Sequence, residues 1–304
     1  MPSPSSHPTH LHPSELGTKE YWDKYYQNDL DNADVDDEDD IEDEDQPDPS
    51  ELESWFDDVG APAKTLEFLT SETFPLSPNY SSDGAGRPSR SHQPTVLDLG
   101  TGNGSALFAL RLEGGYTGRM VGVDYSRQSV ELARKLARQY ISSSGSDGDE
   151  DPNADSSTNS RTGGTGEGVI SFEILDLIHD TPSEQEWWPE GGFDLVLDKG
   201  TFDAISLSSA TVTNPATNSE RRICEMYPAK VLEMVRPGGF LLVTSCNWTE
   251  DEVVSWFTNA DSRRTTTGNF EVYDRIRYPV FEFGGQKGQG VASVCFRKTA
   301  SESQ

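Results

Sequence analysis

The sequence predicts an α/β fold in which a doubly wound, mostly parallel sheet carries helices on both faces and ends in an antiparallel hairpin. Three observations predict it. Strand-like and helix-like segments alternate between residues 95 and 246, a glycine-rich loop joins the first strand to a helix, and two strands with a glycine-rich turn between them follow at residues 270–298. We expect a single domain over residues 52–300, interrupted by disordered insertions.

Three segments have the composition of disordered chain. Residues 1–13 are rich in Pro and Ser, residues 29–51 are acidic and contain no Lys or Arg, and residues 141–168 consist almost wholly of small and polar residues. In such a context the histidines of the first segment are interpreted as bystanders rather than metal ligands: His7, His10 and His12. We therefore expect no metal site.

Between the first two segments, residues 14–28 are predicted to form a short aromatic helix. Its apolar side chains recur at roughly helical intervals behind Ser14, a candidate N-cap. The rings of this helix pack onto a larger body. Alternatively, Trp22 and Tyr26, together with Trp55 beyond the acidic run, close over a bound ligand.

The elements of the domain follow in order. A helix-like stretch ends near Leu69. Strands are predicted where short β-branched or apolar runs occur, at residues 95–100, 120–124, 169–177, 193–200 and 240–246. Helices are predicted where apolar residues recur with helical spacing, at residues 105–112, 127–140 and 229–235, and over 250–257 behind Thr249 as a cap. The closing strands are expected at residues 270–283 and 291–298.

The formal net charge of −29, about half of it from the acidic run, bears on partners. A negative field repels the phosphates of nucleic acid, so no direct nucleic-acid binding is expected, and a basic protein partner is favoured. The acidic run is interpreted as a solvated, self-repelling segment, or alternatively as one that steers such a partner.

Cysteine usage and apolar runs bear on location. The three cysteines are widely spaced and odd in number, which predicts neither a disulfide framework nor a C-x-x-C metal site: Cys224, Cys246 and Cys295. The N-terminus lacks the features of a signal peptide, and no apolar run reaches membrane-spanning length. We expect a soluble, cytoplasmic protein that does not bind membranes.

The segment VLDLGTGNGSALF suggests a ligand-binding loop. Its three glycines, at alternate positions from Gly100 to Gly104, lie where a strand turns into a helix and let the backbone come close to a ligand. Four successive strands also end in an acidic residue: Asp98, Asp124, Asp176 and Asp198. Each acid alone could cap a turn, but the full set favours a binding site at the carboxyl ends of the strands.

The spacing favours an adenosyl ligand that is cationic and lacks phosphates. A dinucleotide loop would read G-x-G-x-x-G, whereas this loop reads G-x-G-x-G and is preceded by Asp98, which would repel phosphate. We expect Asp124 to accept hydrogen bonds from a ribose, Asp176 to accept one from an adenine amino group, and Asp98 to orient an aminoacyl ammonium. S-adenosylmethionine meets this description.

The motifs VLDLGTGNGSALF, GVDYS, FEILDL, FDLVLDKGTFDAISL and RPGGFLLVTSCNW resemble the class I methyltransferases, which have a seven-stranded Rossmann-like sheet. More narrowly, LGTKEYWDKYY, SWFDD and FGGQKGQGVASVCFRK resemble the lysine methyltransferases of translation elongation factor 1-alpha, the methyltransferase-like protein 10 group. The resemblance implies a protein-lysine N-methyltransferase with that factor as substrate. Its cofactor-binding residues would be Asp98, Gly100, Thr101, Gly102, Asn103, Gly104, Asp124, Tyr125, Asp176, Leu177 and Asp198.

Catalysis is expected at the end of the fourth strand, because this fold presents its acceptor there. A lysine amine must lose its proton before it attacks a methyl group, and Asp198 is the candidate to guide the ammonium or take that proton. Thr201, Phe202 and Asp203 are expected to form the wall beside it, and the alternative is that Asp198 only caps a loop. Alternative functions are methylation of another protein or a small molecule, or a non-catalytic scaffold. DKGT in place of N/D-P-P-Y/W argues against a nucleic-acid base as acceptor.

Overall fold

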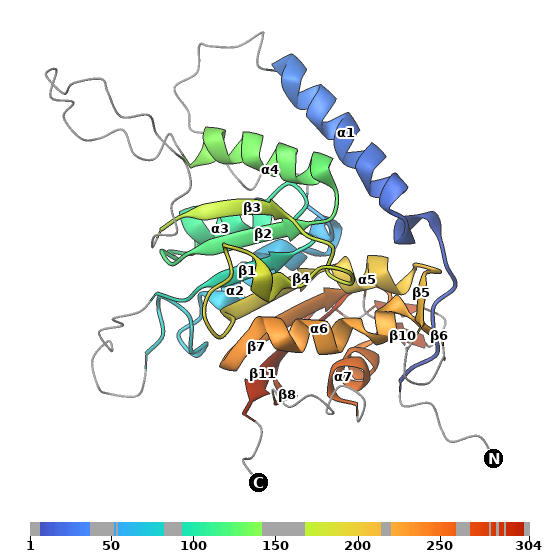
Figure 1. Ribbon diagram of the computed structural model, residues 1–304. Coiled ribbons are helices and arrows are strands. Elements are labelled where there is room, and N and C mark those ends of the chain that lie inside the picture. The colour runs from blue at the N-terminus through green and yellow to red at the C-terminus, as the bar shows by residue number, and fades with distance from the viewer. Residues whose placement is uncertain are drawn as a thin grey trace, which may run out of the picture.

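A computed structural model describes residues 7–36, 52, 54–81, 93–141, 168–213, 220–259, 268–279, 281–283, 286–288 and 290–300. Its centre is a seven-stranded sheet with the strand order β3-β2-β1-β4-β7-β11-β8 (Figure 1). The strands are β1 Val96–Leu99, β2 Met120–Asp124, β3 Ile170–Ile174, β4 Phe193–Lys199, β7 Val235–Ser245, β8 Asn269–Ile276 and β11 Ala292–Thr299. All neighbouring pairs are parallel except those that β11 makes. The predicted doubly wound sheet with an antiparallel C-terminal hairpin is confirmed.

Helices cover both faces of the sheet, and β1 shows how the sequence directs them. Val96 faces one hydrophobic cluster, which α2, α3 and α4 complete, while Leu97 and Leu99 face a second cluster that α6 and α7 complete. Such alternation is the period of two that a strand requires. The helices are α1 Lys19–Asp36, α2 Ala61–Leu69, α3 Ser105–Leu112, α4 Arg127–Tyr140, α5 Thr201–Ser206, α6 Tyr227–Met234 and α7 Glu250–Thr258.

Several elements begin and end where the sequence predicts. Thr249 caps α7, where its hydroxyl accepts a hydrogen bond from the Glu252 amide. The third strand is shorter than expected, so Asp176 lies two residues beyond the end of β3. Two short strand pairs were not predicted: β5 Thr211–Thr213 with β6 Glu220–Arg222, and β9 Phe281–Phe283 with β10 Gln286–Gly288. The single strand expected at residues 270–283 is instead divided into β8, which ends at Ile276, and β9.

The N-terminus differs from the expectation. Residues 7–18, which we call the N-terminal strap, pass beside α5 before the chain enters α1 (Figure 1). The amide of Ser14 donates to the carbonyl of Leu207, and η1 Glu15–Gly17 follows, so Ser14 precedes a 3₁₀ turn rather than capping the helix. The helix itself begins at Lys19 and continues to Asp36, into the acidic run.

Other expectations of disorder lie largely outside the described residues. This holds for residues 1–6, for most of the acidic run and for nearly all of the 141–168 insertion. Among the helices that the structure does describe, none has both the length and the hydrophobicity that crossing a membrane requires.

Candidate active site

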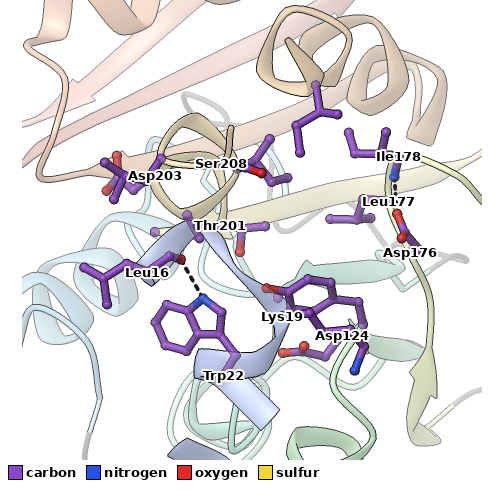
Figure 2. A pocket seen from close by; sticks show the side chains of 18 of the residues that line it. Leu16, Lys19, Trp22, Asp124, Asp176, Leu177, Ile178, Thr201, Asp203 and Ser208 are labelled. Atoms are coloured by element: carbon purple, nitrogen blue, oxygen red, sulfur yellow. Dashed lines mark hydrogen bonds between the residues drawn. The ribbon is translucent and has the colours of Figure 1, made fainter. Parts of the chain in front are cut away.

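A cavity of about 310 Å³ opens at the carboxyl ends of the central strands (Figure 2). Its lining comes from the N-terminal strap and α1, from the loops after β1 to β4, and from α5. Figure 2 shows Asp203 on the opposite side of the cavity from Asp124 and Asp176. A cavity of this size, at this end of a doubly wound sheet, is where such folds bind small ligands.

The glycine-rich loop after β1 contacts the cavity through its backbone. Gly100 has φ +61°, and a Cβ there would meet Oγ1 of Thr201. Gly102 has φ +59°, and a Cβ there would meet the hydroxyl of Tyr26. Positive φ and close approach both call for glycine, so the loop fits tightly between α1 and α5. A smaller hollow of about 50 Å³ adjoins the loop and is lined by Gly100, Thr101, Gly102 and Asn103 among others.

Asp124, the last residue of β2, lines the cavity although it is almost fully buried. One carboxylate oxygen accepts from the Ser126 amide, and the other accepts from the Gly102 amide and the Ser129 hydroxyl. Burial raises its pKa, and these three hydrogen bonds oppose that shift. A carboxylate has about four acceptor positions, so Asp124 retains capacity for a ligand.

Asp176 also lines the cavity, and so do Tyr125 and Leu177, which were predicted to bind the cofactor. The Asp176 carboxylate is half-exposed and accepts from the amides of Ile178 and His179 and pairs with the His179 ring. Partial burial raises its pKa, but these hydrogen bonds outweigh the effect, so its pKa lies below the usual value. Asp176 therefore both caps a turn and presents a carboxylate to the cavity.

Asp98 lies beneath the loop rather than in the lining. Its carboxylate accepts a hydrogen bond of 2.8 Å from the hydroxyl of Thr101, and burial raises its pKa to about 6. The ammonium of Lys199, which does line the cavity, stabilises the charge of Asp98, while burial lowers the pKa of Lys199. Asp98 thus supports the loop through Thr101 and does not itself line the cavity.

Two predicted catalytic residues, Asp198 and Phe202, are buried in the core and do not line the cavity. Asp198 is 1 % exposed; one oxygen accepts from the amides of Thr201 and Phe202, and the other accepts from the Tyr227 hydroxyl. Burial raises its pKa to about 7. Phe202 is fully buried, and its ring stacks on that of Tyr227. These contacts are those of a loop cap, which is the alternative role predicted for Asp198.

The wall of the cavity on this side is formed by Thr201 and Asp203 instead. The carboxylate of Asp203 accepts hydrogen bonds from the Ser245 hydroxyl and the Cys246 amide. Burial raises its pKa above the usual value. Apolar side chains surround this part of the cavity: Leu16, Ile205, Leu207 and Ile223.

Aromatic rings from two segments cover the cavity. Trp22 and Trp55 meet edge to face at 5.3 Å between ring centroids, and both line the cavity with Tyr26 and Phe56. The backbone of Phe56 has φ +71°, in the left-handed region, and its ring lies 3.3 Å from where a Cβ on Gly200 would be. A non-glycine residue in this region is strained and marks a constrained position beside the site.

Sequence reasoning missed the contributions of the strap, of Lys19 and of Lys199. Leu16 and Gly17 of the strap and Lys19 of α1 all line the cavity. A Cβ on Gly17 would overlap the backbone of Leu207, so only glycine fits at this crossing. The segment LGTKEYWDKYY, interpreted as a helix and as part of the family resemblance, contained the signal.

Comparison with known proteins identifies similar chains. The family described as a methyltransferase domain matches residues 91–143, from the approach to β1 to the end of α4. Protein-lysine N-methyltransferase EFM4 of Saccharomyces cerevisiae is 33% identical over 247 residues, which cover 81% of this chain and 83% of that protein. Its namesake in Schizosaccharomyces pombe is 34% identical over 66% of this chain and 68% of that one. EEF1A lysine methyltransferase 2 of Homo sapiens is 29% identical over 67% of this chain and 65% of that one.

Proposed function

Since the chain belongs to the protein-lysine N-methyltransferase family of EFM4, we propose that it transfers a methyl group from S-adenosylmethionine to a lysine of translation elongation factor 1-alpha. The observation that carries the proposal is one cavity that joins Asp124 and Asp176, at the ends of β2 and β3, with Thr201 and Asp203 of α5. The name of the human relative, EEF1A lysine methyltransferase 2, supports this factor as substrate.

The residues of the cavity fit a cationic adenosyl cofactor. Asp124 faces the cavity with acceptor capacity left over, as a ribose diol requires, and the Gly100 backbone permits close approach. Three carboxylates line the cavity against two ammonium groups, which favours a ligand of positive charge: Asp124, Asp176 and Asp203 against Lys19 and Lys199. When bound, S-adenosylmethionine supplies a methyl group activated by its positively charged sulfur.

The acceptor lysine is assigned to the α5 side of the cavity. Its aliphatic stem would pack on Ile205, Leu207 and Ile223, and removal of water there lowers the pKa of the amine. Asp203 is the carboxylate on this side, and its raised pKa makes it a better proton acceptor than an exposed aspartate. We assign to Asp203 the holding of the ammonium and the receipt of its proton, and to Asp198 the positioning of α5.

Charge and cysteine chemistry support the remaining parts of the proposal. A net charge of −29 favours a basic protein partner over nucleic acid. Cytoplasmic location is supported by Cys224, Cys246 and Cys295, which are all free thiols, as a reducing compartment would keep them. We propose residues 52–300 as the main catalytic domain, with the strap and α1 completing its cavity.

A methylation assay tests the proposal. The full chain is incubated with purified elongation factor 1-alpha and methyl-labelled S-adenosylmethionine, and the modified residue is located by mass spectrometry. We expect label on lysine, and its loss when that lysine is replaced by Arg. Label on nucleic acid or on small molecules alone would overturn the lysine assignment, and absence of cofactor binding in calorimetry would favour a scaffold.

A further inference from the structure

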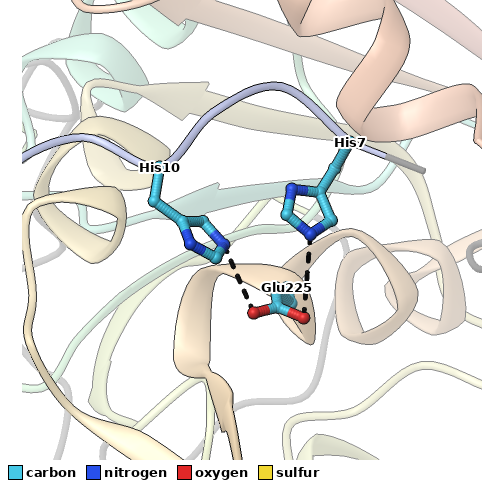
Figure 3. Close-up of side chains that lie close together, drawn as sticks. All are labelled: His7, His10 and Glu225. Atoms are coloured by element: carbon cyan, nitrogen blue, oxygen red, sulfur yellow. Dashed lines mark ion pairs between the residues drawn. The ribbon is translucent and has the colours of Figure 1, made fainter. Parts of the chain in front are cut away.

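Two histidines of the N-terminal strap converge on one glutamate of the domain. Figure 3 shows the rings of His7 and His10 pointing at the carboxylate of Glu225, which lies in the 3₁₀ turn Ile223–Glu225. Nε2 of His10 lies 3.2 Å from Oε1 of Glu225, and Nε2 of His7 lies 3.9 Å from Oε2. All three side chains are partly buried, and the histidines lie more than 200 residues before Glu225 in the sequence.

The nitrogen and oxygen atoms that meet in this cluster can act as ligands of a cation. Nδ1 of His7 lies 2.8 Å from the carbonyl of Pro8, which can only accept, so Nδ1 carries the hydrogen and the Nε2 lone pair of the neutral ring faces the carboxylate. Nε2 of His10 is buried and makes no hydrogen bond. In the tautomer of His10 that leaves Nε2 without a hydrogen, two imidazole lone pairs and a carboxylate converge, an arrangement that favours a cation among them.

We propose that His7, His10 and Glu225 bind a zinc ion, with water as the fourth ligand. Zn–N and Zn–O bonds of about 2.0–2.2 Å in tetrahedral geometry place ligand atoms about 3.3–3.5 Å apart. The ligand atoms of these three residues lie within 4.8 Å of one another, so small side-chain rotations suffice. The bond from Nδ1 of His7 to a carbonyl is the outer contact that fixes a metal-binding imidazole.

Protonation of both rings is the competing way to supply positive charge, and the packing opposes it. The rings of His7 and His10 stack at 4.7 Å between centroids, so two imidazolium charges would repel each other. Trp256 stacks on His7 at 4.8 Å and closes the other side of the pair.

Two arginines, Arg221 and Arg222, contact Glu225 and would influence its affinity for zinc. The guanidinium of Arg222 donates to the carbonyls of Leu11, Ser206 and Ser208, and its amide donates to Oε1 of Glu225. Nε of Arg221 lies 3.5 Å from Oε2 and competes with the metal for that oxygen. Replacing Arg221 by Gln should therefore strengthen zinc binding.

A bound ion would fasten the strap to the domain. Downstream of the histidines the strap is held at Leu11 by Arg222 and at Ser14 by Leu207, and it then supplies Leu16 and Gly17 to the cavity. Zinc at the start of the strap would thus hold the cavity wall in place from outside the cavity.

Zinc titration of the full chain, purified without a polyhistidine tag and measured in competition with a chromophoric chelator, tests the proposal. We expect one equivalent bound with a dissociation constant below about 1 µM, a value typical of sites with several protein ligands. His7→Ala, His10→Ala and Glu225→Gln should each weaken binding at least about tenfold. Gln at 225 keeps an acceptor for the Arg222 amide, so the fold is retained.

His12→Ala is the matched control, because His12 belongs to the same strap but is exposed and outside the cluster. It should bind zinc like the unmodified chain. Hydrogen exchange adds a second readout: zinc should slow exchange of the Ser14 amide in the unmodified chain and in His12→Ala, and not in His7→Ala. A dissociation constant above about 100 µM, or equal binding by His7→Ala and His12→Ala, would overturn the proposal.

Discussion

The hydroxyl of Tyr227 donates a hydrogen bond of 2.8 Å to Oδ2 of Asp198, beneath the floor of the cavity. The other oxygen of Asp198 accepts from the first amides of α5. One buried carboxylate therefore ties α6 to the start of α5, the helix that brings Thr201 and Asp203 to the cavity.

Asp198→Asn removes this buried charge and keeps the shape. The carboxyl titrates near 3.8 when unfolded and near 7 when folded, so its ionisation lowers the free energy of unfolding as pH rises from about 4 through 7. We expect the Asp198→Asn protein to be more stable than the unmodified protein by about 1–3 kcal/mol at pH 8, and its free energy of unfolding in urea to depend less on pH.

The Asp198→Ala protein should lose about 2–4 kcal/mol of stability, because it leaves buried donors unpaired. With Asn, kcat should stay within about threefold; a fall of a hundredfold or more would return the proton-acceptor role to Asp198.

Asp203→Asn tests the acceptor side of the cavity. The amide retains hydrogen bonding to Cys246 but loses the negative charge and the basic oxygen. We expect kcat/KM for the protein substrate to fall about 10²–10⁴-fold, while the dissociation constant of S-adenosylmethionine in calorimetry changes less than about threefold. An equal loss in cofactor affinity would place Asp203 on the cofactor side.

Asp124→Ala is expected to weaken S-adenosylmethionine binding about 10–100-fold without unfolding the protein, because hydrogen bonds to a charged group contribute about 1.5–3 kcal/mol. Calorimetry measures the affinity, and circular dichroism checks the fold. Asp176→Ala should cost less than tenfold, since that carboxylate is half-exposed and already caps a turn. Unchanged affinity in Asp124→Ala would contradict the proposed ribose contact.

Trp55→Ala opens the aromatic cover. Trp55 is 39 % exposed and contacts Trp22 across the cavity mouth, so its loss should raise the Michaelis constants of cofactor and protein substrate about tenfold with little change in melting temperature. Leu112→Ala, an exposed apolar residue at the end of α3, is the control. Unchanged Michaelis constants in a folded Trp55→Ala protein would mean that Trp55 and Trp22 pack against each other without covering a bound ligand.

Local patterns predicted the fold well, because each element carries its own signal. The expected segments 120–124 and 127–140 match β2 and α4 residue for residue, the first a short apolar run and the second a helix with one clear apolar face. Strands β5, β6 and β10 escaped prediction because three residues show no periodicity, and β9 was expected only as the end of one long strand over residues 270–283.

The site was less accessible to prediction, because side-chain direction depends on distant partners. Four acids after four strands look alike in sequence, yet Asp124 and Asp176 line the cavity while Asp98 and Asp198 are committed to Thr101 and Tyr227. Tyr227 is 29 positions away, and nothing in the sequence links it to Asp198. The strap was missed for a similar reason, since its anchors lie about 200 residues downstream.

The place of β11 in the sheet bears on how the protein is made. This strand follows β8 along the chain but lies between β7 and β8, pairing with both. While a ribosome has delivered the chain only as far as residue 290, β7 is an unsatisfied edge that carries apolar residues such as Leu241 and Val243. We therefore expect a chain that stops a few positions before Ala292 to aggregate rather than to fold as a shortened enzyme.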